Sequence, residues 1–144
     1  MNRLLFVFVV LVFAPAAAFA GEAADRAAIE AAVMDYFHGQ GEANLERLNR
    51  AFDADNATMV GVVRNDAGKE EVRAWKDMSA VLARWAAADN PPGGARDGEI
   101  LDMHIVDGRI ATVTFRYADR FYDALILARV DGRWKIVAKA FVGQ

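Results

Sequence analysis

The sequence predicts an α+β domain in which three N-terminal helices cover one face of an antiparallel sheet. In the last third of the chain, from Glu99 to Val142, apolar and polar residues alternate in four runs separated by short polar turns. In the first part, three segments instead repeat their apolar residues at helical spacing. A period of two indicates strands and a period of 3.6 indicates helices, so the two parts predict a sheet and its cover.

The first twenty residues, MNRLLFVFVVLVFAPAAAFA, are expected to be a secretory signal peptide. Arg3 is the basic start, Leu4 to Phe13 the apolar run, and residues 18–20 the small-residue cleavage site before Gly21. The alternative is a membrane anchor, but the apolar run is shorter than the roughly 20 residues of a spanning helix. We therefore expect a signal peptide at 1–20, a single domain at 21–144, and a periplasmic or secreted protein with no membrane attachment after cleavage.

Composition narrows the function classes. The chain has 144 residues, 55% of them hydrophobic, which suits one domain with a core of its own. The absence of cysteine excludes disulfides, thiolate metal ligands and a cysteine nucleophile. The net charge of -3 and the scattered basic residues argue against a nucleic acid partner. His38 and His104 are too far apart for a metal motif, and Ser79 has no histidine at a telling spacing, so we expect no metal, no cofactor and no nucleophilic triad.

The first helix is predicted from Glu22 to about Phe37, where Gly39 and Gly41 stop it. Asn44 is a suitable N-cap for a second helix from Leu45 to Phe52. A strand over residues 57–64, a turn at 65–68 and a short strand at 69–73 follow. The third helix is predicted from Trp75 to about residue 88, because Trp75, Met78, Leu82 and Trp85 form one stripe. Residues 89–94 form a linker.

The register of the last four strands depends on three turns, at residues 107–108, 119–120 and 131–132. Read as two-residue hairpin loops, they place Arg116 directly opposite Asp123, on the face that also carries Trp134. Both faces are then largely apolar, so we expect the helices to cover one and a second copy of the chain to cover the other. The expected homodimer interface is the outer sheet face, which also carries His104 and consists mainly of Val113, Phe115, Tyr117, Tyr122, Ile126, Val137 and Phe141.

Two stretches resemble a known family. One is YFHG at residues 36–39, followed by GE at 41–42 and by Leu45, Leu48 and Phe52; the other is FYDALIL at 121–127 followed by DGRWKIVAKAF at 131–141. Both resemble the putative lumazine-binding family of the nuclear transport factor 2-like superfamily. The resemblance implies a cystatin-like layout, a cone-shaped curved sheet wrapped on three helices, with a pocket at its open end and frequent dimerisation through the outer sheet face. Relatives in the superfamily include isomerases, dehydratases, epoxide hydrolases and non-catalytic binding domains.

The candidate site combines an apolar cavity with a few polar groups. Arg116 and Asp123 form either a polar anchor for a ligand or a structural ion pair. Tyr36 offers a hydroxyl from the first helix, and His38 is either a general base or an exposed helix-end residue. The expected ligand-binding residues are Tyr36, Met59, Trp75, Met78, Arg116, Asp123 and Trp134.

Three functions follow from this site. The first is an exported domain that binds a small and mainly apolar molecule or serves as a non-catalytic binding domain. The second is a cofactor-free isomerase, dehydratase or hydrolase in which Asp123 or His38 carries a proton and Tyr36 steadies developing charge. The third is a protein-interaction scaffold with a vestigial pocket.

Overall fold

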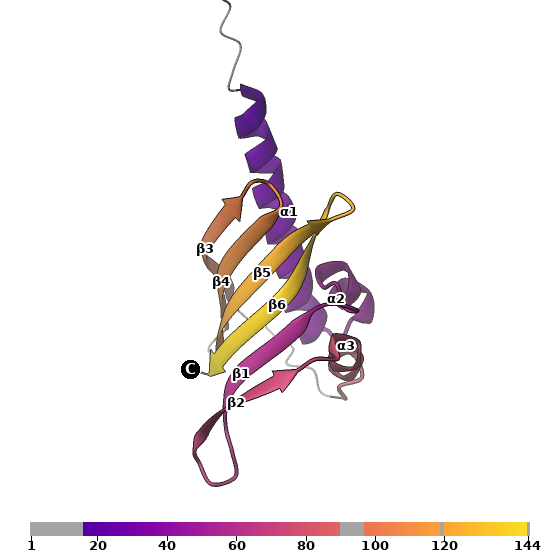
Figure 1. Ribbon diagram of the computed structural model, residues 1–144. Helices are drawn as coiled ribbons and strands as arrows, with labels where there is room; N and C mark the ends of the chain where they lie inside the picture. The colour runs from indigo at the N-terminus through magenta and orange to yellow at the C-terminus, as the bar shows by residue number, and fades with distance from the viewer. Residues whose placement is uncertain (1–15, 90–96, 119, 144) are drawn as a thin grey trace, which may run out of the picture.

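The computed structural model describes residues 16–89, 97–118 and 120–143, and within them three helices pack against a six-stranded sheet (Figure 1). The helices are α1 (Ala16–Gly41), α2 (Leu45–Ala51) and α3 (Met78–Ala86). The strands are β1 (Thr58–Arg64), β2 (Glu70–Trp75), β3 (Gly98–Val106), β4 (Ile110–Tyr117), β5 (Phe121–Val130) and β6 (Arg133–Gly143). The α+β class is confirmed. Most of the expected signal peptide, most of the linker at 89–94, and Asp119 of the second turn lie outside the described residues.

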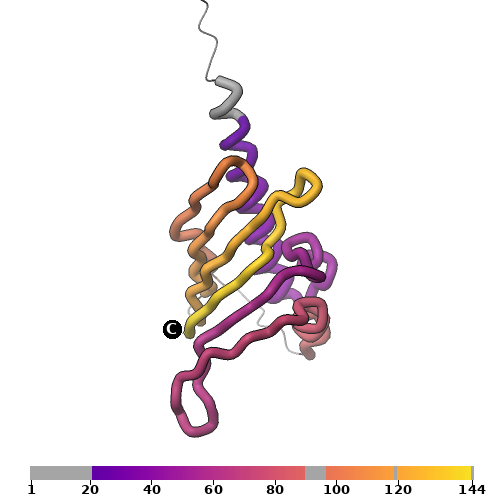
Figure 2. Tube along the Cα trace, viewed as in Figure 1, coloured from indigo at the N-terminus to yellow at the C-terminus, as the bar shows by residue number. Residues whose placement is uncertain are grey.

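The strands follow the order β2-β1-β6-β5-β4-β3, and β1 runs parallel to β6 while every other neighbouring pair is antiparallel. The sheet curves around α1, and the β1–β2 hairpin extends from one end of it (Figure 2). The helices therefore fill the concave side of a cone, as the sequence predicted. None of the helices in the described ranges has the length and apolar character needed to cross a bilayer.

The apolar stripe of α1 is confirmed as core, since Ile29, Val33 and Tyr36 are at most 1% exposed. The helix begins at Ala16, before the predicted start at Glu22. Of the two glycines expected to stop it, Gly41 is its last residue, whereas Gly39 lies within it. The missing side chain instead allows α2 to approach, because a Cβ at Gly39 would lie 3.0 Å from Leu48 Cγ. Glycine serves here as a close-contact residue rather than as a helix terminator.

Short polar contacts attach α2 to α1. Asn44 caps α2 as predicted, its side-chain oxygen accepting from the Arg47 backbone N–H at 3.1 Å. Asp35 on α1 forms ion pairs with Arg50 at 2.9 Å and Arg47 at 3.0 Å. The hydrogen bond from Arg50 is the largest influence on Asp35 and holds the pKa of its carboxyl below the usual value. These contacts fix the segment of α1 that carries Tyr36.

Helix α3 begins later than predicted. Asp77 is its N-cap and accepts from the Ala80 backbone N–H at 2.9 Å, so the helix starts at Met78. Trp75 belongs to β2, where it pairs with Met59 of β1. Met78 and Leu82 of the predicted stripe are both fully buried. The stripe is thus real on α3, but Trp75 reaches the same interior from the sheet.

The predicted pairing of β4 is wrong by one residue with respect to both of its neighbours, β3 and β5. The backbone N–H of Arg109 donates to Val106, and that of Arg120 to Tyr117, as in two-residue turns. However, Val106 pairs with Ile110 and Tyr117 with Phe121, so one additional residue follows each turn. Only the turn at Asp131-Gly132, between the paired residues Val130 and Arg133, is a plain two-residue loop. Both of its residues have positive φ, as the favoured hairpin turns require.

Because each shift of one residue reverses the faces, β4 is turned over relative to the prediction. Phe115, not Arg116, stands opposite Asp123, and Arg116 stands opposite Tyr122. A bulge at Val137 likewise reverses the second half of β6, since Leu127 pairs with Ile136 but Ile126 pairs with Ala138. The predicted Arg116–Asp123 pair therefore does not exist.

The same shifts correct the outer face. Tyr122 and Ile126 point outward and are each 43% exposed, as expected. Val137, at the bulge, is half-buried. Four residues assigned to the outer face lie inside instead: Val113, Phe115 and Tyr117 are buried in the core, and Phe141 lines the cavity described below. The outward residues of β4 are instead Ile110, Thr112, Thr114 and Arg116.

Candidate functional site

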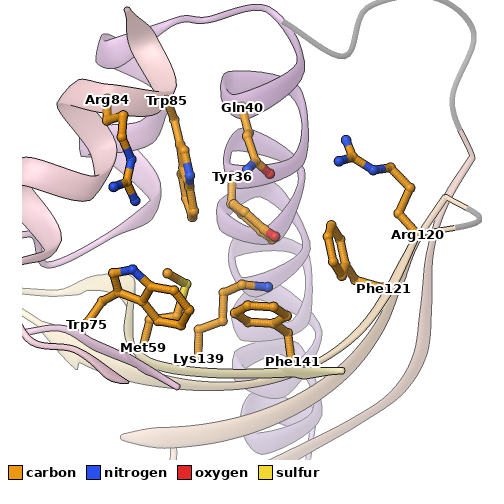
Figure 3. A pocket seen from close by; sticks show the side chains of 10 residues that line it. All are labelled: Tyr36, Gln40, Met59, Trp75, Arg84, Trp85, Arg120, Phe121, Lys139 and Phe141. Carbon is orange, nitrogen blue, oxygen red and sulfur yellow. The ribbon is translucent and has the colours of Figure 1, made fainter. Parts of the chain in front are cut away.

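A cavity of about 180 Å³ opens between α1, α3 and the concave face of the sheet (Figure 3). Helix α1 contributes Tyr36 and Gln40, and α3 contributes Arg84 and Trp85. The remaining lining residues come from the strands and from the turn before β5: Met59, Trp75, Arg120, Phe121, Lys139 and Phe141. Five of the ten lining side chains are aromatic.

The aromatic rings brace one another around the cavity. The ring centroids of Trp75 and Phe141 are 5.7 Å apart, those of Phe121 and Phe141 are 5.4 Å apart, and those of Tyr36 and Trp85 are 6.0 Å apart. These separations are typical of favourable edge and tilted aromatic pairs. The cavity is therefore a slot whose walls are mainly aromatic.

Gly61 on β1 makes room for one of these walls. It stands beside Phe141 in the parallel β1–β6 ladder, and a Cβ at this position would lie 2.2 Å from Phe141 Cζ. No real side chain fits at that distance, so any larger residue must displace the ring. Glycine at this position sets the shape of the cavity.

A buried polar triad lies at the base of the cavity. The Tyr36 hydroxyl donates to Asp123 Oδ2 at 2.8 Å, and the Lys139 ammonium forms an ion pair with Asp123 Oδ1. The Asp123 side chain is 0% exposed and the Lys139 side chain 4% exposed. Buried charges persist only when they are paired, and here the pair is supplemented by the tyrosine. Tyr36 and Lys139 line the cavity, whereas Asp123 lies behind them.

The ammonium of Lys139 is held among aromatic rings. Its Nζ lies 5.0 Å from the ring centroid of Tyr36 and 5.1 Å from that of Phe141. Burial lowers the pKa of Lys139 from 10.5 to about 8, and the Asp123 carboxylate opposes the shift. Lys139 is thus a lysine whose neutral form is accessible close to neutral pH.

All three charged residues that line the cavity are basic. Besides Lys139 at the base, Arg84 and Arg120 lie on opposite sides, as Figure 3 shows. Both arginines are exposed, and neither has a carboxylate partner in the part of the chain that the structure describes. Arg120 lies 5.2 Å from the ring centroid of Phe121. The cavity therefore presents a positive field to anything that enters it.

The structure brings together only part of the expected ligand-binding set. Tyr36, Met59 and Trp75 line the cavity, and Asp123 lies directly behind it. Met78, the first residue of α3, is fully buried and does not line the cavity.

Arg116 and Trp134 lie elsewhere. Arg116 bonds to Glu99 Oε2 at 2.8 Å, because the extra residue after the second turn puts it on the other side of the sheet from Asp123. Trp134 donates from Nε1 to Asp25 Oδ1 at 3.0 Å and so ties the first half of α1 to the β5–β6 hairpin. Its face was predicted correctly, but its place along the strand is at the far end from the cavity lining.

Of the three candidate catalytic residues, only Tyr36 lines the cavity. The His38 side chain is 44% exposed and lies 4.0 Å from Glu42 near the end of α1, outside the lining. Asp123 is enclosed by Lys139 and Tyr36. His104 belongs to β3, where its side chain is exposed on the outer face of the sheet. In the described ranges, no group of three or more histidine, aspartate or glutamate side chains is arranged to hold a metal ion.

Sequence reasoning missed Lys139, Arg84 and Arg120. Lys139 had a detectable signal, since it is the single charge in the apolar run from Ile136 to Phe141. The alternation assigned it to the outer face because the bulge at Val137 was not foreseen. Arg120 was read as part of a turn.

The sequence matches the family described as putative lumazine-binding over residues 24–142, and the chain belongs to this family. None of the curated proteins matches it.

Solved structures share the fold. A nuclear transport factor 2-like protein of unknown function from Shewanella baltica is 21% identical, with a TM-score of 0.67 over 85% of this chain and 95% of that one. One from Methylobacillus flagellatus is 27% identical, with a TM-score of 0.61 over 83% and 92%. A ketosteroid isomerase-like protein from Erwinia carotovora is 15% identical, with a TM-score of 0.59 over 81% and 94%. The predicted superfamily is thereby confirmed.

Proposed function

We propose that the protein binds a small planar molecule that carries an anionic group. The observation that carries this proposal is the combination of aromatic walls with charged lining residues that are all basic. Flat rings stack favourably between Trp75, Trp85 and Phe141, and a carboxylate, phosphate or enolate is attracted by the arginines and by Lys139. A cationic ligand would meet repulsion from Arg84 and Arg120, whereas the charge of Lys139 is compensated by Asp123.

The size of the cavity limits the ligand. About 180 Å³ is close to the roughly 150 Å³ of an engineered protein cavity that takes up benzene, so one ring fits inside and a second can extend toward the mouth. Burying about 150 Å² of ring surface is worth about 4 kcal/mol. A charge-assisted hydrogen bond adds about 1.5–3 kcal/mol. The charge therefore supplies selectivity, and the rings supply most of the affinity.

The family description suggests lumazine, a planar bicyclic molecule, as one ligand to test. Its ring system suits the aromatic slot, while its polar edge can face Gln40 and the arginines. The proposal is broader than this compound, because the cavity residues select for planarity and negative charge rather than for one ring system.

Calorimetric titration with 2-naphthoate, its neutral analogue 2-naphthamide, and lumazine tests the proposal. We expect 2-naphthoate to bind at least about tenfold more tightly than 2-naphthamide, which is about 1.4 kcal/mol. Arg120→Ser should reduce this preference, and Arg84→Ser/Arg120→Ser should remove most of it. Arg109→Ser is the matched control, because Arg109 is exposed at the β3–β4 turn and pairs with Asp107. Equal affinities for the anion and the amide would refute the proposed selectivity.

A second candidate function is cofactor-free proton transfer, favoured by the hydrogen bond between Tyr36 and Asp123. In this function Tyr36 contacts the substrate, and Asp123 orients the Tyr36 hydroxyl by accepting its hydrogen bond from behind. Exchange of the C1 protons of 2-tetralone in D₂O, followed by NMR, tests it. Catalysed exchange that is lost in Tyr36→Phe would support an isomerase, and an exchange rate equal to that of buffer would exclude it for this probe.

We also propose that the mature protein is exported and begins at Gly21. The basic, apolar and small-residue pattern of residues 1–20 supports this. Mass measurement of the protein from periplasmic and cytoplasmic fractions tests it. A retained leader in a membrane fraction would favour the anchor instead.

A homodimer through the outer sheet face is proposed as well. Six large apolar residues of this face, each 37–50% exposed, support it: Val60, Val62, Ile110, Tyr122, Ile126 and Val142. Sedimentation at micromolar concentration is the test. We expect a dimer that Ile126→Glu converts to a monomer, whereas Leu45→Glu, at an exposed site on α2 away from the outer sheet face, leaves it intact. A monomeric wild type would exclude the dimer.

A further inference from the structure

We propose that Lys139 captures carbonyl compounds in the cavity by forming an imine with them. The chemical class of ligand is a small aromatic or conjugated aldehyde that also carries an anionic group. This inference rests on the proposed function, because it uses the same cavity and names the reactive group within it.

The geometry isolates one amine for this chemistry. Lys139 lies at the base of an aromatic cavity, and Asp123 meets it from β5 while Tyr36 meets it from α1. The other charged groups that face the cavity are Arg84 of α3 and Arg120 of the turn before β5. A ligand whose anionic end contacts these arginines directs its opposite end toward Lys139. An aldehyde at that end is placed against the amine.

The surroundings also supply the proton transfers. Asp123 Oδ1, in the ion pair, is placed to take a proton from the ammonium and release the neutral amine. The nitrogen lone pair attacks the carbonyl carbon, the C=O π electrons move to the oxygen, and the proton taken up by Asp123 passes through the Tyr36 hydroxyl to that oxygen. The nitrogen returns one proton to Asp123, which gives the neutral carbinolamine. The same relay delivers this second proton to the hydroxyl, the C–O bond breaks as water leaves, and the iminium nitrogen loses its last proton to the Asp123 carboxylate.

The balance is one amine and one carbonyl to one imine and one water. No electrons are exchanged with an outside partner, so no oxidant or reductant is needed. Exclusion of bulk water by the aromatic walls slows the reverse hydrolysis.

The lowered pKa of Lys139 agrees with its proposed role as the reacting amine. A lysine with a pKa of about 8 has a neutral fraction about 300-fold larger at pH 7 than one at 10.5. The other lysines provide internal comparison: Lys69 and Lys76 are exposed, and the half-buried Lys135 donates to the Asn49 carbonyl at 2.6 Å. If Lys139 reacts faster than these lysines, the difference is due to its surroundings in the cavity.

The experiment treats the intact protein with 4-formylbenzoate and sodium cyanoborohydride at pH 7, then maps modified lysines by peptide mass spectrometry. We expect reductive labelling of Lys139 at least about tenfold faster than of Lys69 or Lys76. Labelling of Lys139 should saturate with 4-formylbenzoate and be suppressed by 2-naphthoate. Because the controls lie in the same chain, the test needs no variant that risks unfolding.

Two outcomes overturn the inference, and they differ in what they say of the proposed function. If 2-naphthoate binds in calorimetry but labelling follows surface exposure and spares Lys139, the binding site stands and imine formation is refuted. If 2-naphthoate does not bind and Lys139 is not labelled, both fail. Asp123→Asn adds a further readout: the pH at which labelling of Lys139 is half-maximal should fall, because the carboxylate that raises its pKa is gone.

Discussion

Replacement of Lys139 by methionine is expected to lower the free energy of unfolding by about 3–5 kcal/mol, the typical loss when one partner of a buried ion pair is removed. Methionine retains most of the side-chain volume, so the loss arises from charge rather than from a cavity. The Asp123 side chain, 0% exposed, would keep only the Tyr36 hydroxyl as partner.

The double variant Asp123→Leu/Lys139→Met separates the charge from the packing. It removes both charges together, so the remaining penalty is the Tyr36 hydroxyl left without its acceptor, about 1–3 kcal/mol. The double variant should thus be more stable than Lys139→Met alone. Lys76→Met is the control for the substitution itself, and its exposed position predicts a change within about 0.5 kcal/mol.

Urea denaturation followed by circular dichroism gives the three free energies, and thermal unfolding checks their order. For a domain of this size, 1 kcal/mol corresponds to about 4 °C in Tm, so Lys139→Met should lower Tm by about 12–20 °C. A loss below about 1 kcal/mol for Lys139→Met, or a double variant less stable than the single one, would refute the buried pair.

Three further predictions follow. The wild type should gain stability relative to Asp123→Leu/Lys139→Met as pH rises from about 8 to 10.5. The reason is that the pKa of Lys139 is lower in the folded state, so the unfolded chain binds more protons than the folded one in this pH range. Urea denaturation across this range would show no such gain if the pKa of Lys139 were the same in both states. Gly61→Ala should cost about 1–3 kcal/mol and weaken 2-naphthoate binding, since a Cβ displaces the Phe141 ring; unchanged denaturation and affinity would contradict this packing. Asn44→Ala should cost about 1 kcal/mol in denaturation through loss of the α2 cap, with no loss expected if the cap does not form.

Much of the fold could be predicted because periodicity and caps are local. The stripe Ile29, Val33, Tyr36 packs as core, and Asn44 caps α2 where polar capping chemistry predicted. The strand pattern also gave the correct number and order of the last four strands. These features depend on residues a few positions apart, which a single sequence records directly.

The site was predicted less well because it depends on single-residue shifts. One additional residue after the second turn separates Arg116 from Asp123, and one bulge at Val137 brings Lys139 inside. Turn composition marks where a chain reverses, but not whether an extra residue follows. Asp123 was correctly singled out as a charge on an apolar face; its partner was the lysine of the next strand rather than the arginine of the preceding one.

The central claim, that the aromatic cavity is the binding site, is tested most directly by NMR of the three tryptophan indole N–H groups during titration with 2-naphthoate. Trp75 and Trp85 line the cavity, whereas the Trp134 indole is bonded to Asp25 outside it and is the internal reference. Saturable shifts of the Trp75 and Trp85 signals with an unchanged Trp134 signal are predicted. Unchanged Trp75 and Trp85 signals, or an equal shift of Trp134, would contradict the account.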